Sequence, residues 1–392
     1  MTVPRVRTGL VELLSGARPD LQRARIGLIA HPASVTSELT FAADALRTGG
    51  FDLRALFGPQ HGVRGEKQDN MIESASFRDP RLGIPAHSLY GNVRRPTEEM
   101  LRGLDVLLFD LQDVGVRVYT FVWTMTLAME ACRDAGVRFV VLDRPNPITG
   151  TLREGTVLQE GFESFVGLHP VPLRHGLTAG EMALVANERF GIGCELDVVR
   201  CDGWNRADWF DDAGLPFVLP SPNLPTFDSC IVYPGMVLLE GTNLSEGRGT
   251  TRPFELFGAP YLDAHQLTMH LDRLALPGVV FRPCQFEPTF QKHAGMLCGG
   301  AQLHVTDRRA FRPVETAVAI LQTVRQLAPE EFAWREPPYE YEERLMPIDI
   351  LWGNAALREG LGAGESHARI MQRANADLPA FEELVHPLLL YD

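Results

Sequence analysis

Carboxylates, guanidinium groups and an amide crowd into one glycine-rich stretch of the chain, residues 235–254: Glu240, Asn243, Glu246, Arg248 and Arg252. Glycine lets backbone N–H groups approach a ligand closely, and polar side chains crowded onto a loop after a strand usually bind something. The alternative is a glycine-rich turn that holds a solvated ion pair. The apolar run 235–239 predicts a short buried strand that leads into this loop.

Glu246 has the strongest case among the carboxylates for work in a site. It lies two residues from Arg248, so its ionisation is expected to depend on that cation. Glu240 ends an apolar run, where burial would raise its pKa and suit it to general-acid work, whereas pairing with an arginine would do the reverse. The sequence leaves both possibilities open for Glu240.

Short apolar segments alternate with helical patterns in the first part of the chain. Strands are predicted over 25–30, 51–57, 105–111 and 137–142, and helices over 38–47 and 121–135. Strands that alternate with helices imply right-handed crossovers and a parallel sheet. The pattern predicts an α/β fold with a Rossmann-like, doubly wound parallel sheet.

The last part of the chain predicts a second, smaller α+β domain, with helices over 263–274, 314–327 and 366–374 and strands over 279–286 and 301–306. We expect residues 1–260 to form the N-terminal domain that carries the site. Residues 261–392 are expected to form the C-terminal domain that closes the cleft. The proline-rich segment 220–225 predicts a rigid extended piece of chain that holds Asn223 in place.

Polar clusters come after the predicted strands in residues 57–66, 110–119 and 143–147. Ligands bind beyond the carboxyl ends of the strands in such a sheet, so we expect these clusters to face one cleft together with the glycine-rich stretch. The cleft would collect the following side chains: Gln60, His61, Arg64, Glu66, Asp110, Gln112, Asp113, Arg117, Tyr119, Asp143, Arg144, Asn146, His175, Asn223, Glu240, Asn243, Glu246, Arg248 and Arg252. Amides, carboxylates and an aromatic ring suit a polyhydroxylated ligand, and arginines suit a ligand carboxylate. An acidic sugar is the expected ligand.

Some of these residues also have structural explanations. Asp110 and Asp113 could cap the following helix, and Asp143 and Arg144 could form an ion pair that locks the turn after them. His61 could be a core or turn histidine. Its neighbours in a loop at a strand end favour a functional role.

Composition and charge exclude several classes of protein. The net charge of -13 has no basic cluster to offset it, so neither nucleic acid nor an anionic membrane is an expected partner. The 6 cysteines form no C-x-x-C pair, as expected for free thiols in a reducing compartment. The first residues lack the apolar run of a signal peptide, which predicts a cytoplasmic location. The oligomeric state is not determined.

No motif for a bound cofactor or metal is present. The strand over 25–30 is not followed by G-x-G-x-x-G, which argues against a dinucleotide, and no G-x-x-x-x-G-K-[ST] loop occurs. We therefore expect neither a cofactor nor a metal.

Several long motifs resemble the exo-β-N-acetylmuramidase family, formerly known only as a domain of unknown function. They are the runs 59–65, 109–120, 143–147, 221–226 and 240–254, and they occur in the family's order over nearly the whole chain. Members of that family remove N-acetylmuramic acid from the non-reducing ends of peptidoglycan fragments. The resemblance implies a pocket that is closed at one end and that recognises a lactyl carboxylate and an acetamido group.

The chain departs from the family pattern at Gln60. Many members carry a glutamate at this position, which is a leading candidate for the catalytic acid. A glutamine cannot donate a proton as a carboxylic acid does, and glycoside hydrolysis usually needs such an acid. Three possibilities are open: another carboxylate such as Glu66 or Glu246 takes over, the acetamido group of the substrate assists, or the protein binds without cleaving.

The resulting prediction is a β-N-acetylmuramidase that works in cell-wall recycling on small amino-sugar or muropeptide substrates. Its expected catalytic residues are Glu246, Glu66, His61, Gln60 and Asp113. The other residues of the expected cleft, apart from Arg252, would bind substrate. The alternative is a non-catalytic protein that binds amino sugars or muropeptides and has lost the acid at Gln60.

Overall fold

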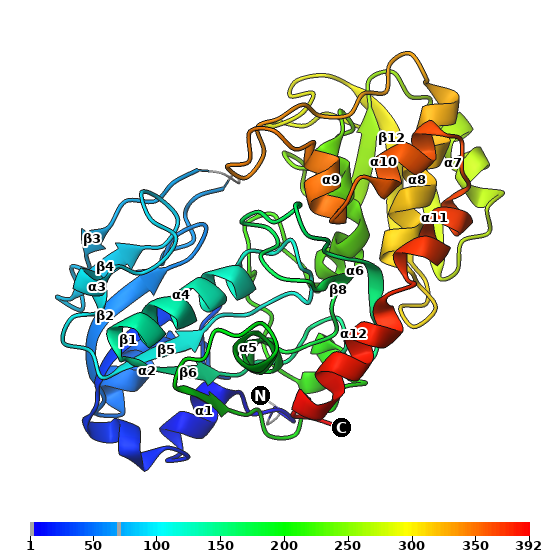
Figure 1. Ribbon diagram of the computed structural model, residues 1–392. Helices are drawn as coiled ribbons and strands as arrows, with labels where there is room; N and C mark the ends of the chain where they lie inside the picture. Colours follow the sequence, from blue (N-terminus) through cyan, green and yellow to red (C-terminus); the bar gives the residue numbers. More distant parts are fainter. Residues whose placement is uncertain (1–3, 69–71) are drawn as a thin grey trace.

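The chain forms two lobes in the computed structural model, which describes residues 4–68 and 72–392 (Figure 1). The first lobe is built on a sheet of seven strands in the order β3-β4-β2-β1-β5-β6-β9. The strands are β1 (Arg25–Ala30), β2 (Asp52–Gly58), β3 (Phe77–Arg78), β4 (Pro85–Ser88), β5 (Val106–Asp110), β6 (Arg138–Leu142) and β9 (Leu196–Val199). All neighbouring pairs are parallel except β3 with β4. The first three residues of the N-terminal segment, where no signal peptide is expected, lie outside the described residues.

Helices cover both faces of this sheet. Helices α1 (Gly9–Leu14) and α2 (Ala42–Thr48) pack on one face, and α4 (Phe121–Ala135) and α5 (Ala179–Glu188) pack on the other (Figure 1). The chain runs from β1 outward to β2 and then crosses to β5 on the other side of β1. These features confirm the predicted doubly wound α/β sheet.

Apolar side chains from the central strands alternate between the two faces. Leu56 and Leu108 lie in the core under α1 and α2, whereas Phe57 and Phe109 lie in the core under α4 and α5. Successive side chains of a strand point to opposite faces, so a sheet buried on both sides needs continuous apolar runs. Those runs made the strands recognisable in the sequence.

The second lobe contains an antiparallel sheet, β10 (Leu256–Ala259), β12 (Cys298–Val305) and β11 (Val279–Phe286), in that order. Its helices are α6 (Phe227–Met236), α7 (Ala264–Asp272), α8 (Pro313–Leu327), α9 (Pro347–Trp352), α10 (Ala356–Gly362) and α11 (His367–Ala374). Helix α12 (Leu378–Val385) then returns to the first lobe, and the described ends of the chain lie near each other (Figure 1). The smaller α+β unit is therefore confirmed.

The boundary at residues 260 and 261 stays a prediction. Residues 260 and 261 lie between β10 and α7. Strand β10 comes before this boundary and pairs with β12, which comes after it. A short two-stranded sheet, β7 (Glu154–Val157) with β8 (Pro172–Arg174), lies along the path between the lobes, and its strand β7 contacts α8 and α11.

The sequence-based assignment was wrong for two segments. Residues 235–239 are helical rather than extended, because Thr226 caps α6 and a 3₁₀ helix over Val237–Gly241 continues it. A short apolar run does not by itself distinguish a buried strand from a buried helix. The segment 220–225 is a turn, closed by a hydrogen bond from Leu224 N to Ser221 O at 2.9 Å, and not an extended piece.

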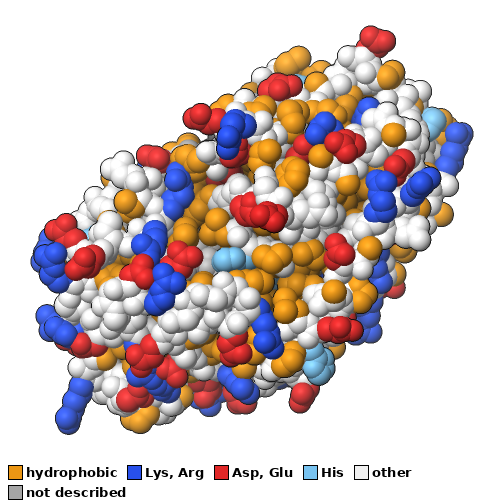
Figure 2. Space-filling view, in the orientation of Figure 1, with side chains coloured by type: hydrophobic (Ala, Val, Ile, Leu, Met, Phe, Trp, Pro, Cys, Tyr) orange, Lys and Arg blue, Asp and Glu red, His pale blue; other side chains and the backbone are white. Residues whose placement is uncertain are grey.

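Charged side chains of both signs are scattered over both lobes, and hydrophobic side chains gather between the lobes on the face shown in Figure 2. In the described part of the chain, none of the helices combines the length and the apolar character that crossing a membrane requires.

Candidate active site

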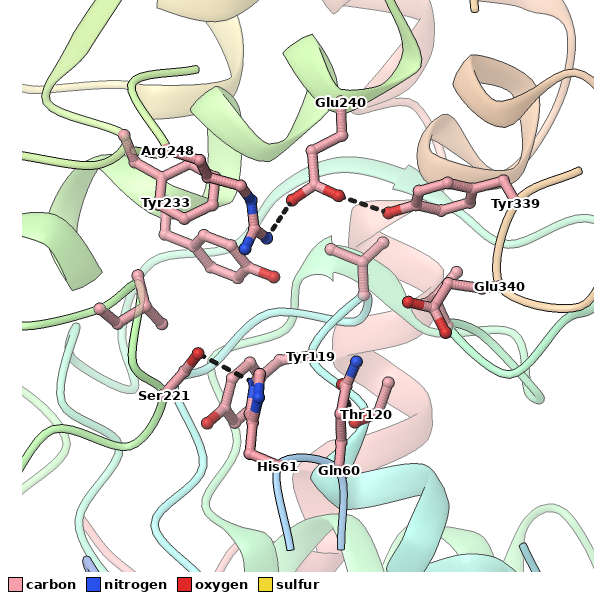
Figure 3. A pocket seen from close by; sticks show the side chains of 14 residues that line it. Gln60, His61, Tyr119, Thr120, Ser221, Tyr233, Glu240, Arg248, Tyr339 and Glu340 are labelled. Carbon is pink, nitrogen blue, oxygen red and sulfur yellow. Dashed lines mark hydrogen bonds and ion pairs between the residues drawn. The ribbon is translucent and has the colours of Figure 1, made fainter. Parts of the chain in front are cut away.

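A polar pocket lies where the two lobes meet (Figure 3). It encloses about 420 Å³ of empty space, its open mouth included. The first lobe contributes Gln60, His61, Val118, Tyr119, Thr120, Val166, Ser221 and Leu224, and the second contributes Tyr233, Glu240, Arg248, Phe254, Tyr339 and Glu340. The pocket brings together Gln60, His61, Tyr119, Glu240 and Arg248 from the residues expected in the cleft.

His61 is held in place at the carboxyl end of β2. Its Nδ1 lies 2.7 Å from the carbonyl oxygen of Lys67, and its Nε2 lies 3.1 Å from Oγ of Ser221. The backbone of His61 is left-handed, with φ of 70°. A non-glycine residue seldom adopts this conformation, and such positions cluster at functional sites. The turn after β2 therefore aims the imidazole at the pocket.

Gln60 is part of a chain of hydrogen bonds across the pocket wall. The Thr120 hydroxyl donates to Oε1 of Gln60 at 2.8 Å, and Nε2 of Gln60 donates to the Tyr90 hydroxyl at 3.2 Å. Tyr90 in turn donates to Oε2 of Glu340 at 3.0 Å. The amide of Gln60 thus links the two lobes through Tyr90.

Glu240 and Arg248 form the opposite wall of the pocket (Figure 3). Nη2 of Arg248 donates to Oε1 of Glu240 at 2.7 Å, and the Tyr339 hydroxyl donates to Oε2 at 2.9 Å. The pair is almost completely buried, and the two carboxylates beside Arg248 raise the pKa of this arginine despite its burial. A buried, hydrogen-bonded ion pair of this kind gives the wall a fixed geometry.

Glu246 lies behind Arg248 rather than in the pocket lining. Its Oε1 is 3.3 Å from Nε of Arg248, and its Oε2 accepts a hydrogen bond from Nζ of Lys292 at 2.9 Å. Burial by itself raises the pKa of Glu246, but the charges of Lys292 and Arg248 outweigh it, so the pKa lies below its ordinary value. A proton-donor role for Glu246 stays a prediction that these contacts do not favour.

Glu340 is the second carboxylate that lines the pocket. Its side chain is 3% exposed, and this burial raises its pKa to about 7. The hydrogen bond from Tyr90 lowers the pKa, and the nearby charge of Glu240 raises it further. Glu340 therefore stays protonated at a pH where an exposed glutamate is ionised.

Three of the expected site residues form ion pairs or hydrogen bonds at the carboxyl edge of the sheet. Asp110 is fully buried and makes a bidentate ion pair with Arg144, with its Oδ1 2.6 Å from Nε of the arginine. Asp143 accepts hydrogen bonds from Gly180 N and from the hydroxyls of Thr178 and Tyr391. None of the three residues lines the pocket. The ion pair that the sequence allowed between the side chains of Asp143 and Arg144 is replaced by the ion pair of Arg144 with Asp110.

A further group of expected binding residues supports the loops around β8. Gln112 donates to the carbonyl oxygens of Asp113 and Pro145, and Asn146 donates to that of Leu177. Asp113 accepts from Gly115 N at 2.7 Å and lies 3.4 Å from Nε2 of His175. Oδ1 of Asp113 and Nε2 of His175 are nevertheless buried without a hydrogen-bond partner. The alternative that Asp110 or Asp113 caps a helix is wrong because Thr120 occupies the N-cap position of α4.

Arg117 is fully buried behind the pocket. Its guanidinium donates to the carbonyl oxygens of Thr156, Val171 and Leu351, and burial lowers its pKa to about 9. It thus connects the first lobe to α9.

Four expected residues lie away from the lining. Glu66 is exposed, and Arg64 stacks over the ring of Phe77 at 4.2 Å. Asn223 donates to the carbonyl oxygen of Gln68, and Asn243 donates to that of Glu331. Roles for these residues in catalysis or binding stay predictions.

Sequence reasoning missed the residues that the second lobe adds through one loop. Tyr339 and Glu340 line the pocket, and neither was among the residues expected in the cleft. The pair Pro337 and Pro338 directly before them was a usable signal, because consecutive prolines stiffen the backbone of the loop that contains them. Tyr90 and Tyr233 had no comparable signal.

No cluster of three or more histidine, cysteine, aspartate or glutamate side chains that could hold a metal ion occurs among residues 4–68 and 72–392. The expectation of no cofactor and no metal stays a prediction.

The fold and the pocket together define a two-lobed α/β protein with a Rossmann-like sheet and a polar site between the lobes. Comparison with known families is more specific. Residues 26–228 match the N-terminal domain of exo-β-N-acetylmuramidase NamZ, and residues 231–391 match its C-terminal domain. The chain belongs to the exo-β-N-acetylmuramidase NamZ family, which confirms the resemblance seen in the sequence.

Individual relatives agree with this assignment. The peptidoglycan β-N-acetylmuramidase NamZ of Bacillus subtilis (strain 168) is 46% identical over 389 residues, which cover 99% of this chain and 92% of the relative. Two crystal structures of DUF1343 family proteins from Bacteroides fragilis NCTC 9343 share the fold. One has a TM-score of 0.90 at 34% identity over 100% of both chains, and the other has 0.78 at 27% identity over 99% of both chains.

Proposed function

We propose that this protein is a glycoside hydrolase that removes β-linked N-acetylmuramic acid from the non-reducing ends of peptidoglycan fragments. The observation that carries the proposal is membership of the exo-β-N-acetylmuramidase family over nearly the whole chain, with a relative at 46% identity that is a peptidoglycan β-N-acetylmuramidase. Work on muropeptides in the cytoplasm, as part of cell-wall recycling, is the setting that we propose for it.

The lining of the pocket suits this sugar. Aromatic rings of Tyr119, Tyr233 and Phe254 offer apolar faces to a pyranose ring, and hydroxyls and amides offer hydrogen bonds to its substituents. Arg248 is the cation of the lining that can attract the lactyl carboxylate. The cation is the feature that distinguishes N-acetylmuramic acid from a neutral sugar without a lactyl group.

An exo-acting enzyme needs a site that accepts only a chain end. The loop before α9 reaches from the second lobe to the first (Figure 1). There Tyr341 packs edge-on against Tyr90, with the ring centres 5.9 Å apart. The cation of Arg94 lies 3.3 Å from the centre of the Tyr341 ring. These contacts join the loop that carries Tyr339 and Glu340 into the pocket lining to the first lobe, which supports cleavage from an end.

Cleavage requires a proton for the leaving oxygen and a water molecule for the anomeric carbon. Gln60 cannot supply the proton, so the pocket carboxylates Glu240 and Glu340 are the candidates in its lining. His61 and Ser221 face the same space and are placed to orient the sugar or the water. The acetamido group of the substrate remains a second route to attack at the anomeric carbon.

The direct test is hydrolysis of a chromogenic β-N-acetylmuramide by the purified protein, with the matching β-N-acetylglucosaminide as control. We expect release from the muramide and at least about tenfold less from the glucosaminide, because the latter lacks the carboxylate that Arg248 attracts. Release from neither substrate, or from the glucosaminide alone, contradicts the proposal.

The amide at position 60 supports one other function, a protein that binds amino sugars or muropeptides without cleaving them. Calorimetry with N-acetylmuramic acid separates the two. Binding without turnover in the wild-type protein, together with turnover in Gln60→Glu, favours the binding protein. Turnover in the wild-type protein excludes it.

A further inference from the structure

We propose that Glu340 is the catalytic acid that protonates the glycosidic oxygen, and that Gln60 is a positioning residue that acts on it through Tyr90. This inference rests on the proposed hydrolase function. It assigns the proton transfer to a residue of the second lobe, on the loop that precedes α9, rather than to the turn after β2.

The first argument is the position of Glu340 at the tip of a strained turn. Tyr339 and Glu342 exchange two backbone hydrogen bonds of 2.9 Å, and the two residues between them have positive φ, 45° for Glu340 and 69° for Tyr341. Turns of this type favour glycine and asparagine at both positions. A glutamate and a tyrosine are unfavourable there, and such strain is typical of residues held for function.

The second argument is the direction of the hydrogen bonds between Gln60 and Glu340. The hydroxyl of Thr120 donates a hydrogen bond to the oxygen of the Gln60 amide, so the NH₂ group of that amide faces Tyr90. An NH₂ group can only donate, and the Tyr90 hydroxyl therefore directs its single proton to Glu340. A carboxylate at position 60 would compete with Glu340 for this proton, whereas the NH₂ group of the amide cannot accept it.

The third argument is the difference between the two carboxylates of the lining. Glu240 is the ion-pair partner of Arg248 and accepts a second hydrogen bond from Tyr339. Both of its carboxylate oxygens are thus engaged in hydrogen bonds within the pocket wall. Glu246, behind Arg248, contacts two cations and does not line the pocket.

The charges around Glu340 come from several elements. Tyr90 and Arg94 face it from the first lobe, and Glu240 and Arg248 face it from the second. Burial and the charge of Glu240 raise its pKa to about 7, against the opposing effects of Tyr90 and the two arginines. This value keeps the acid form available near neutral pH.

The proposed step conserves atoms and electrons. The carboxyl of Glu340 transfers its proton to the glycosidic oxygen while the bond from that oxygen to the anomeric carbon breaks, with the bonding electron pair moving to the oxygen. A water molecule supplies the hydroxyl group that ends on the anomeric carbon. The proton which that water loses restores the acid form of Glu340, directly or through solvent.

The test compares Glu340→Gln with wild type on two substrates, the disaccharide N-acetylmuramyl-β-1,4-N-acetylglucosamine and a 2,4-dinitrophenyl β-N-acetylmuramide. A dinitrophenolate leaves without protonation, so the acid matters little for it. We expect kcat/KM to fall at least about 100-fold for the disaccharide and less than about 10-fold for the aryl glycoside. Because kcat/KM reports the steps up to bond cleavage, a later step does not enter the comparison.

Glu343→Gln is the matched control, since Glu343 is an exposed glutamate of the same loop. We expect wild-type kcat/KM on both substrates. Activity of Glu340→Gln on the aryl glycoside shows in the same assay that the variant is folded. Equal losses on both substrates, or no loss on the disaccharide, overturn the assignment of Glu340 while leaving the hydrolase function intact. A wild-type protein inactive on both substrates contradicts the hydrolase function itself.

The positioning role is tested by the pH profile of kcat/KM on the disaccharide. In wild type we expect activity to fall as the pH rises through about 7, where Glu340 loses its proton. Tyr90→Phe removes a hydrogen bond that favours the ionised form, so this limb should shift to higher pH. Gln60→Met, which frees the Tyr90 hydroxyl, should move the limb as well. Unchanged profiles in both variants overturn the positioning role.

Discussion

The hydroxyl of Tyr391 donates a hydrogen bond of 2.6 Å to Oδ2 of Asp143, which ties the C-terminal segment to the residue that follows β6. Asp143 is fully buried, and this burial raises its pKa to about 6 against the hydrogen bonds from Tyr391, Gly180 and Thr178. Because the pKa of Asp143 is higher in the folded protein than in the unfolded chain, its protonated form contributes fully to the free energy of unfolding below about pH 4. This contribution is lost as the pH rises through about 6.

Tyr391→Phe is therefore expected to destabilise the protein more at pH 8 than at pH 5. The variant removes a donor that favours the ionised carboxylate, which costs about 2 kcal/mol when Asp143 is charged. Urea unfolding at both pH values measures the difference. Tyr261→Phe is the control, because the hydroxyl of Tyr261 donates to the neutral amide of Asn243 and its loss should not depend on pH in this range. Equal losses at pH 5 and pH 8 for Tyr391→Phe contradict the prediction.

Glu246→Gln should affect stability more than bond cleavage. The variant removes the negative charge that pairs with both Lys292 and Arg248 in a buried cluster. This change should lower the free energy of unfolding by about 3 kcal/mol at neutral pH. Because the pKa of Glu246 lies below its ordinary value, this stabilisation is present above about pH 4.5 and is lost as the pH falls through the lowered pKa. Unfolding experiments across this range measure it.

The exposed Glu330 provides the control, since Glu330→Gln should leave the free energy of unfolding unchanged. Turnover of Glu246→Gln on the disaccharide should exceed that of Glu340→Gln. If Glu246→Gln abolishes turnover without a loss of stability, Glu246 is a proton-transfer group, as the sequence suggested.

His61→Asn should separate the backbone role of this position from that of its ring. Asparagine tolerates the left-handed conformation, whereas a β-branched residue does not, so His61→Val should be about 1 to 2 kcal/mol less stable than His61→Asn. Both variants lack the imidazole that contacts Ser221, and both should lose about tenfold or more in kcat/KM. Full activity in His61→Asn would exclude a role for the ring in the reaction.

Gly235→Ala should disrupt the contact between α6 and α8. A Cβ atom at this position would lie 1.8 Å from the carbonyl oxygen of Pro313, which is backbone and cannot move aside easily. We expect a loss of about 3 kcal/mol in unfolding free energy. Gly362→Ala is the control, because its Cβ would meet no atom within 4 Å, and it should be neutral or slightly stabilising. A stable Gly235→Ala protein would show that the two helices are less closely packed than described.

The family and the parallel sheet could be predicted from the sequence because their signals are local. Apolar runs such as 106–110 identify buried strands without knowledge of their neighbours, and long motifs keep their order along the chain. The capping box of α5, with Thr178 and Glu181, depends on residues that are equally close in sequence. Gln60 and His61 lie just after β2 and Tyr119 lies in the loop after β5, and all three were found by the rule for ligand sites in such sheets.

Only the tertiary structure decided which polar side chains face the pocket. Burying a charge without a partner is costly, so Asp110 pairs with Arg144, 34 residues away, and Glu246 pairs with Lys292, 46 residues away. The sequence supplies each group but not its partner, because these pairs form where segments far apart in the chain pack together within one lobe. The packing of the two lobes carries Glu340 to Tyr90, 250 residues earlier in the chain, and so links its carboxyl through the Tyr90 hydroxyl to the amide of Gln60.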